Sequence, residues 1–146
     1  VVPKLKNSNS GIDKLIASIK KHKDITENSA IEILKVHKHL LEIMKEISGL
    51  EKRSLSSKYL HFHLPNLFFI YDSRARSVLT RIFKENKDYK KKYKNIKSEL
   101  GVDEFVLDKE YATFFIRSFI LRNEIKKEIT MRQFDNILIN IANKQL

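Results

Sequence analysis

Titratable and aromatic side chains gather between residues 56 and 76, in the segment SSKYLHFHLPNLFFIYDSRAR. Histidines and tyrosines precede an aspartate at position 72, and arginines follow it. Polar groups of this kind at a junction between helices are typical of binding and catalytic sites. We take Asp72 as the candidate catalytic residue. The residues expected to line a pocket with it are Lys58, His61, His63 and Tyr71.

Asp72 also has a purely structural explanation. Asp72 or Ser73 could begin a helix, because a side-chain oxygen at that position accepts hydrogen bonds from backbone N–H groups of the first turn. Arg74 and Arg76, which we expect to contact nucleic acid, would then be solvated residues of that helix. Both interpretations stay open on the sequence alone.

The histidines of this region do not form a metal-binding pattern. His61 and His63 are two residues apart, as are His37 and His39. In a helix this spacing turns the rings about 200° apart, which is poor geometry for one metal ion. No carboxylate motif accompanies either pair. We therefore expect neither a metal site nor a cofactor.

A second candidate region is the lysine-rich run from residue 84 to 97, which includes Tyr89 and Tyr93 four residues apart. Lysines with interspersed aromatic rings suit a phosphate backbone and exposed bases, without reading a base sequence. Alternatively, the tyrosines anchor a helix to the core while the lysines are solvated. The residues of this run expected to contact nucleic acid are Lys87, Lys90, Lys91 and Lys94.

The net charge favours an anionic partner. Lys and Arg total 29 against 18 for Asp and Glu, which gives a formal charge of +11. Nucleic acid is the first partner to expect from such an excess. Most of the excess is lysine, however, and the chain is also rich in Ile and Asn. An AT-rich genome would produce the same bias, so composition alone does not separate the two explanations.

The segment Ile70-Tyr71-Asp72-Ser73-Arg74-Ala75-Arg76 resembles the helix-hairpin-helix DNA glycosylase superfamily, in which an apolar turn leads to a catalytic Asp at the start of a helix. The resemblance covers about residues 30 to 85 and is carried mainly by residues 49 to 76. It implies that Asp72 stabilises a developing sugar cation or activates the attacking nucleophile. It also implies DNA, more than RNA, as the partner.

The family's hairpin would correspond to residues 48 to 53, with Gly49, Lys52 and Arg53 contacting phosphate. Two departures reduce the match. The hairpin of the family has closely spaced glycines, and this chain has only Gly49. The lysine of bifunctional members falls at Ser54, beside Lys52 and Arg53, so retained base excision is an open question.

The low content of Gly (3) and Pro (2) argues against β-sandwiches and barrels and for long helices. We expect an all-α fold, a single orthogonal helical bundle of six or seven helices formed by residues 1–146, with residues 1–9 as an extended lead-in. Ser10 begins a possible capping box, Thr26 or Ser29 begins the next helix and Gly49 ends it. Leu67 to Tyr71 is expected to be a buried linker. The expected helical ranges are 11–22, 29–48, 52–63, 72–83, 84–99, 107–128 and 130–141.

Several function classes are set aside. The chain has no Cys, which removes thiol catalysis and Cys–zinc sites. It has no Gly-rich phosphate loop and no apolar run long enough to cross a membrane. We expect a cytoplasmic protein that binds nucleic acid, with enzyme activity uncertain. The alternative is a non-catalytic protein-interaction module of a larger bacterial system, and a ribonuclease-type toxin is a third, lesser option.

Overall fold

The computed structural model describes residues 2–101, 106–125 and 128–144, and the side chains from residue 11 onward within these ranges. The described residues form seven α-helices and no strand, so the predicted all-α fold is confirmed. The helices are α1 (Val2–Ile19), α2 (Glu27–Ser48), α3 (Arg53–His63), α4 (Ser73–Glu85), α5 (Lys87–Leu100), α6 (Lys109–Ile125) and α7 (Met131–Lys144).

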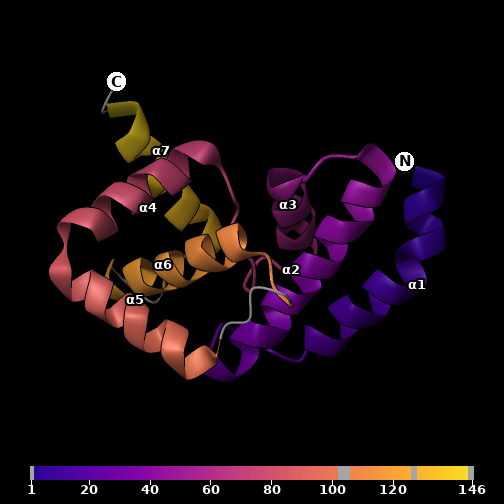
Figure 1. Cartoon of the computed structure of the whole chain (residues 1–146), viewed down its shortest axis with the longest axis horizontal. Helices are drawn as coiled ribbons and strands as arrows, with labels where there is room; N and C mark the ends of the chain where they lie inside the picture. The colour runs from indigo at the N-terminus through magenta and orange to yellow at the C-terminus, as the bar shows by residue number, and fades with distance from the viewer. Residues whose placement is uncertain (1, 102–105, 126–127, 145–146) are drawn as a thin grey trace.

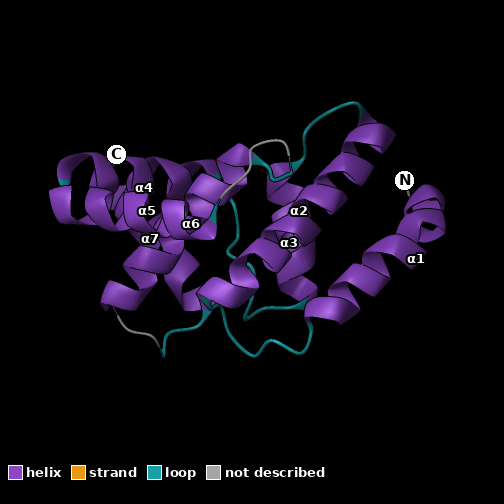
Figure 2. Cartoon of the chain, turned by 60° about the horizontal axis from the view of Figure 1, so that its bottom comes forward, coloured by secondary structure: helices purple, strands orange, loops and turns teal. Residues whose placement is uncertain are grey.

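The helices form two groups, α1 to α3 and α4 to α7, which contact each other where α2 meets α5 and where His37 of α2 stacks on Tyr111 of α6 (Figure 1). At one end of the longest axis, α1 packs against α2, and α2 packs against α3. At the other end, α4 contacts α5, α6 and α7. The loop from residue 64 to 72 connects the two groups, as the teal trace in Figure 2 shows. This loop carries Asp72 to the start of α4, next to α3.

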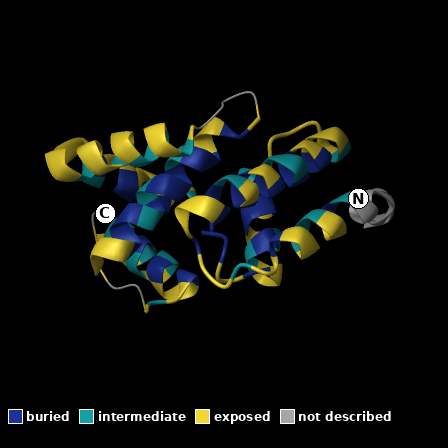
Figure 3. Cartoon of the chain, turned by 90° about the horizontal axis from the view of Figure 1, so that it is seen from below, coloured by how far each residue is buried: buried dark blue, intermediate teal, exposed yellow. Residues whose placement is uncertain are grey.

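The core is a cluster of apolar side chains that extends from Ile12 in α1 to Leu138 in α7. Helix α6 contributes large rings to it, including the fully buried Tyr111 and Phe115, as expected for a central helix with apolar residues nearly all round. In Figure 3 the buried residues face the interior and the exposed ones cover the outer helix faces. Burial of apolar surface against α6 is therefore what holds the two groups together.

The linker between α3 and α4 is buried, as the sequence predicts. Leu67, Phe68, Phe69 and Ile70 are all in the core although they form neither helix nor strand. Their backbone is held by side chains. The Tyr111 hydroxyl donates to the Phe69 carbonyl at 2.7 Å. Buried backbone groups need such partners, so this loop has a fixed course to Asp72.

Several helix boundaries follow local capping rules. Thr26 and Ser29, the two alternatives for the start of α2, act together: each side chain bonds the other's backbone N–H in a capping box. Gly49 ends α2 with a left-handed backbone, φ +74°. At α7, Thr130 and Gln133 form a second capping box.

Two predictions for the N-terminal region are wrong. Residues 2–9 are not an extended lead-in, because α1 begins at Val2. Pro3 lies in the first turn of α1, where a missing N–H breaks no helical hydrogen bond. Ser10 and Gly11 consequently lie inside α1 and begin no helix. The residues at Ser10 match a capping pattern, but no cap forms there because α1 continues through Ser10.

Candidate nucleic-acid interface

Asp72 is the N-cap of α4, and its carboxylate is only partly used by that role. Oδ1 accepts hydrogen bonds from the backbone N–H groups of Arg74 at 2.8 Å and Ala75 at 3.4 Å. Oδ2 has no hydrogen bond among the described residues. Partial burial opposes ionisation of Asp72, but these N–H donors and the Arg74 guanidinium lower its pKa. Asp72 is thus a half-buried, ionised carboxylate with one oxygen left over.

A second carboxylate, Asp135 of α7, is near enough to Asp72 for the two charges to interact. Burial raises the pKa of Asp135, and the negative charge of Asp72 raises it further. Its Oδ1 is buried and has no hydrogen-bond partner among the described residues. Lys58 and His61 of α3 are close enough to act on the same pKa in the opposite direction. Two carboxylates whose pKa values are pushed apart could serve as a proton donor and a charge stabiliser.

His61 is oriented by the linker. Its Nδ1 lies 2.9 Å from the Phe68 carbonyl oxygen, which fixes Nδ1 as the hydrogen-bond donor. In the neutral ring this leaves Nε2 as a free acceptor. Lys58, His61 and Asp72, three residues of the predicted pocket, thus all act on the pKa of Asp135.

The other two residues of the predicted pocket lie elsewhere. The Tyr71 hydroxyl donates to Glu110 of α6 at 3.3 Å, and its ring packs on Phe114. His63 is exposed and its ring contacts Tyr59 and Phe62. Neighbouring residues of an extended segment point to opposite sides, which explains why Tyr71 and Asp72 face different helices.

A groove formed by α4, α5 and α6 is lined mostly by basic side chains. Three adjoining hollows of about 490, 350 and 460 Å³ are all lined by Thr80. Each pair of hollows also has one basic residue in common, which is Arg117, Arg76 or Lys84. We call these three hollows the basic groove. Glu85 and Glu110 are the acidic residues that line it. The basic residues that line it are Arg76, Arg81, Lys84, Lys90, Lys94, Lys97, Lys109 and Arg117.

The spacing of the groove cations follows from the helices that carry them. Arg76, Thr80 and Lys84 are four residues apart on α4 and so share one helix face. Lys90, Lys94 and Lys97, which are four and three residues apart, likewise share one face of α5. None of these five basic side chains forms an ion pair with a carboxylate within the described ranges. Two rows of basic side chains, one on α4 and one on α5, thus line the basic groove.

The tyrosines of α5 anchor the helix to the core. The Tyr89 ring lies 5.5 Å from the Phe83 ring of α4, centroid to centroid. The Tyr93 hydroxyl lies 3.3 Å from the Thr113 hydroxyl of α6. This is the structural alternative that the sequence left open for the tyrosines. Because it holds α5 in place, it also determines which lysines face the groove.

The remaining residues expected to contact nucleic acid are scattered. Arg53 is bound by carboxylates: two bonds of 2.8 and 2.9 Å to Asp108, one of 2.8 Å to Glu51, and Glu110 at 3.4 Å. Its charge is neutralised within the protein. Gly49 and Lys52 lie between α2 and α3, away from α4 and α5 in Figure 1. The other three, exposed and outside the basic groove, are Arg74, Lys87 and Lys91.

Sequence reasoning missed two residues, Asp135 and Arg117. Arg117 interrupts a helix that is otherwise apolar nearly all round, and that interruption is the signal that could have identified it. Asp135 lies on α7 among ordinary polar positions, and only the packing of α7 against α4 brings it to Asp72. No local pattern marks such a residue.

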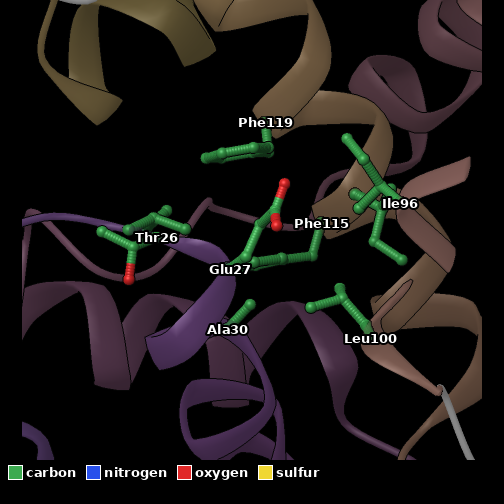
Figure 4. A pocket seen from close by; sticks show the side chains of 9 residues that line it. Thr26, Glu27, Ala30, Ile96, Leu100, Phe115 and Phe119 are labelled. Atoms are coloured by element: carbon green, nitrogen blue, oxygen red, sulfur yellow. The ribbon is translucent and has the colours of Figure 1, made fainter. Parts of the chain in front are cut away.

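The enclosed pocket between α2, α5 and α6 is not a ligand site. Its volume is about 10 Å³, which is the space of one water molecule. Figure 4 shows its lining of apolar side chains, including Ile96, Phe115 and Phe119, with Glu27 as the charged side chain at its edge. It is a small packing defect of the core.

Comparisons with known proteins give no family assignment. No protein-family model matches the chain, and neither a curated protein nor a solved structure is similar to it. Among the described helices, none has both the length and the apolar character needed to cross a bilayer. The function of this protein therefore has to be inferred from its own geometry.

Proposed function

We propose that this protein binds nucleic acid through the basic groove, and that the groove cations contact the phosphate backbone. The observation that supports this most is the set of seven groove cations without a carboxylate partner among the described residues: Arg76, Arg81, Lys84, Lys90, Lys94, Lys97 and Arg117. Positive charge aligned along a concave surface favours a polyanion. The resemblance to the helix-hairpin-helix glycosylases makes DNA the first polymer to test.

The test is a charge-matched comparison of two triple variants by fluorescence anisotropy on single-stranded, duplex and abasic-site DNA and on RNA. One variant replaces Lys90, Lys94 and Lys97 by Gln. The control replaces Lys14 of α1, Lys20 just after α1 and Lys35 of α2 by Gln; all three are exposed and line no part of the groove. Both have a net charge lowered by three.

For the wild type we expect a fall of log K with log salt, with a slope of up to about −5 on single strands if all seven cations bind phosphate. The groove variant should lose at least about tenfold in affinity and flatten the slope by about 2. The control should change little. Equal losses in both variants would refute the groove as the binding surface. Absence of wild-type binding at low salt would refute the function and favour a protein partner.

A second candidate function is base excision, supported by the free oxygen of Asp72 next to Asp135 and His61. A carboxylate there could stabilise positive charge on a sugar, and Asp135 with its raised pKa could hold a proton. This catalytic pair lies next to α3 and α7, whereas the basic groove is lined by α4, α5 and α6. For excision, DNA bound in the basic groove would therefore also have to extend past the start of α4 to contact Asp72.

Asp72→Asn tests excision without destroying the cap, because Asn is as good an N-cap as Asp. Duplexes containing deoxyuridine, hypoxanthine or an alkylated purine are incubated with the protein, and abasic products are revealed by alkaline cleavage. We expect wild-type cleavage of at least one duplex and its loss in Asp72→Asn. Activity that survives in this variant would exclude the proposed role of Asp72.

A further inference from the structure

We infer that Arg76 and Arg117 form a clamp for a single phosphate group at the floor of the basic groove. This inference rests on the proposed function and adds a fixed position to it. The lysines attract a polyanion diffusely, whereas two guanidinium groups can hold one phosphate in a defined geometry. Both arginines line the hollow of about 350 Å³ between α4 and α6.

Arg117 is held in place from below by aromatic rings. Its guanidinium carbon lies 5.7 Å from the centre of the Phe83 ring and 5.6 Å from the centre of the Tyr93 ring. One terminal nitrogen, Nη1, donates to the Thr80 hydroxyl at 3.4 Å. Rings on α4 and α5 thus fix the position of a side chain that belongs to α6. A guanidinium stacked in this way loses little freedom when it binds an anion.

The charge of Arg117 lacks an acidic partner among the residues that the structure describes. Its Nε is buried without a hydrogen-bond partner, and no carboxylate pairs with the guanidinium among the described residues. Burial lowers the pKa of Arg117, and the neighbouring positive charge of Arg76 lowers it further. Two like charges facing a common hollow repel each other. An anion between them removes that repulsion and supplies acceptors for the unused N–H groups.

Phosphate is the anion that fits this site best. A phosphate group offers several oxygens, so it can accept from two guanidinium forks at once. The lysine rows lead towards the same floor, which suits a phosphate within a chain of others. The group could be an internal phosphodiester or a terminal phosphomonoester of the strand. Glu110 also lines the hollow, but its carboxylate forms an ion pair with Arg53 and accepts a hydrogen bond from the Tyr71 hydroxyl.

The test compares Arg117→Gln with Arg132→Gln, an exposed arginine of α7 that lines no part of the groove. Affinity is measured by anisotropy on single-stranded oligonucleotides with a 5′-hydroxyl or a 5′-phosphate. We expect Arg117→Gln to lose more than about tenfold, Arg132→Gln less than twofold, and Arg117→Lys to recover little, because an ammonium cannot reproduce the fork. A loss confined to the 5′-phosphorylated strand identifies a terminal phosphate, and an equal loss on both identifies an internal one.

Two outcomes separate this inference from the proposed function. If the wild type binds with a steep salt dependence and both single variants bind equally well, the groove remains and the clamp is refuted. If the wild type binds no oligonucleotide, thermal stabilisation by inorganic pyrophosphate tests the clamp alone. Stabilisation of the wild type and Arg132→Gln but not of Arg117→Gln supports it, and equal responses refute it. Circular dichroism confirms that each variant is folded.

Discussion

His37 of α2 is the most deeply buried histidine, and its ring stacks face to face on Tyr111 of α6. The ring centroids are 3.7 Å apart and the planes are 10° from parallel. Neither ring nitrogen has a hydrogen-bond partner among the described residues. Burial lowers the pKa of His37 from 6.5 to about 3, although the charge of Asp108 opposes the shift in part. His37 is therefore a neutral ring in the folded protein at all physiological pH values.

We expect His37 to make the fold sensitive to mild acid. The unfolded chain binds a proton at His37 below pH 6.5 and the folded chain does not until about pH 3, so the free energy of unfolding falls as pH drops through that window. Between pH 7 and pH 5 this amounts to about 2 kcal/mol. His37→Phe keeps a stacked ring without the titration. Urea unfolding at both pH values should show that this variant loses about 2 kcal/mol less than the wild type, and parallel losses would contradict the assignment.

Arg53 and Asp108 form the main buried ion pair, with the Asp108 side chain only 7% exposed. The hydrogen bonds that Arg53 donates to Asp108 raise the pKa of Arg53, and Arg53 in turn lowers the pKa of Asp108 despite its burial. Arg53→Met strands a buried carboxylate and should lower the free energy of unfolding by about 3 kcal/mol. Arg53→Lys should be intermediate, because an ammonium makes no bidentate contact. Urea titrations at pH 7 measure both, and a loss below 1 kcal/mol in Arg53→Met would contradict this structural role.

At the scale of helices, the same substitution should have opposite effects at two glycines. Gly49 has φ +74° at the end of α2, and a methyl group there meets no neighbour within 4 Å, so Gly49→Ala introduces only backbone strain. Gly11 lies inside α1, where a methyl group would be 3.5 Å from His39, an ordinary contact. We expect Gly49→Ala to lower stability by about 1 kcal/mol and Gly11→Ala to raise it by about 0.5–1 kcal/mol. Thermal melts of both variants decide this, and two changes of the same sign would contradict it.

The elements could be predicted from the sequence wherever a local signal determines them. The ranges expected for α2, α3 and α7 lie within a few residues of the observed ones, and capping residues indicated the ends of α2 and the start of α4. The prediction was wrong at α1, because Pro3 and polar residues read as irregular structure while the helix continues through them. Capping patterns are short and recur by chance, as Ser10 shows.

The candidate sites were predictable only in part, because they depend on contacts between distant segments. Lys58, His61 and Asp72 were identified from one stretch of chain, and all three act on the pKa of Asp135. Asp135 joins them only through the packing of α7 on α4. Arg53 was assigned to phosphate contact, yet its partner Asp108 is 55 positions away in the sequence. Tertiary pairing of this kind leaves no trace in local spacing.

At the scale of the whole molecule, the charge of +11 should act against stability when salt is low. Lys90, Lys94 and Lys97 lie on one face of α5 and have no carboxylate partner among the described residues. We therefore expect them to repel one another more than lysines that are spread over α1 and α2. We expect the Gln triple variant at Lys90, Lys94 and Lys97 to melt higher than the control triple variant in 10 mM salt. The difference should vanish near 0.5 M salt, where screening is nearly complete. A control that gains as much as the groove variant would indicate a general charge effect.

The groove has two rows of cations because one residue joins the helices that carry them. Asn86 is at once the C-cap of α4 and the N-cap of α5, where its side chain accepts from the Tyr89 N–H. No spare residue separates the two helices. One residue inserted after Asn86 would turn every later side chain of α5 by about 100° relative to the cap, so that lysines and tyrosines would exchange faces. This corner should accept changes of residue but not of length, and insertions or deletions in related chains should fall outside it.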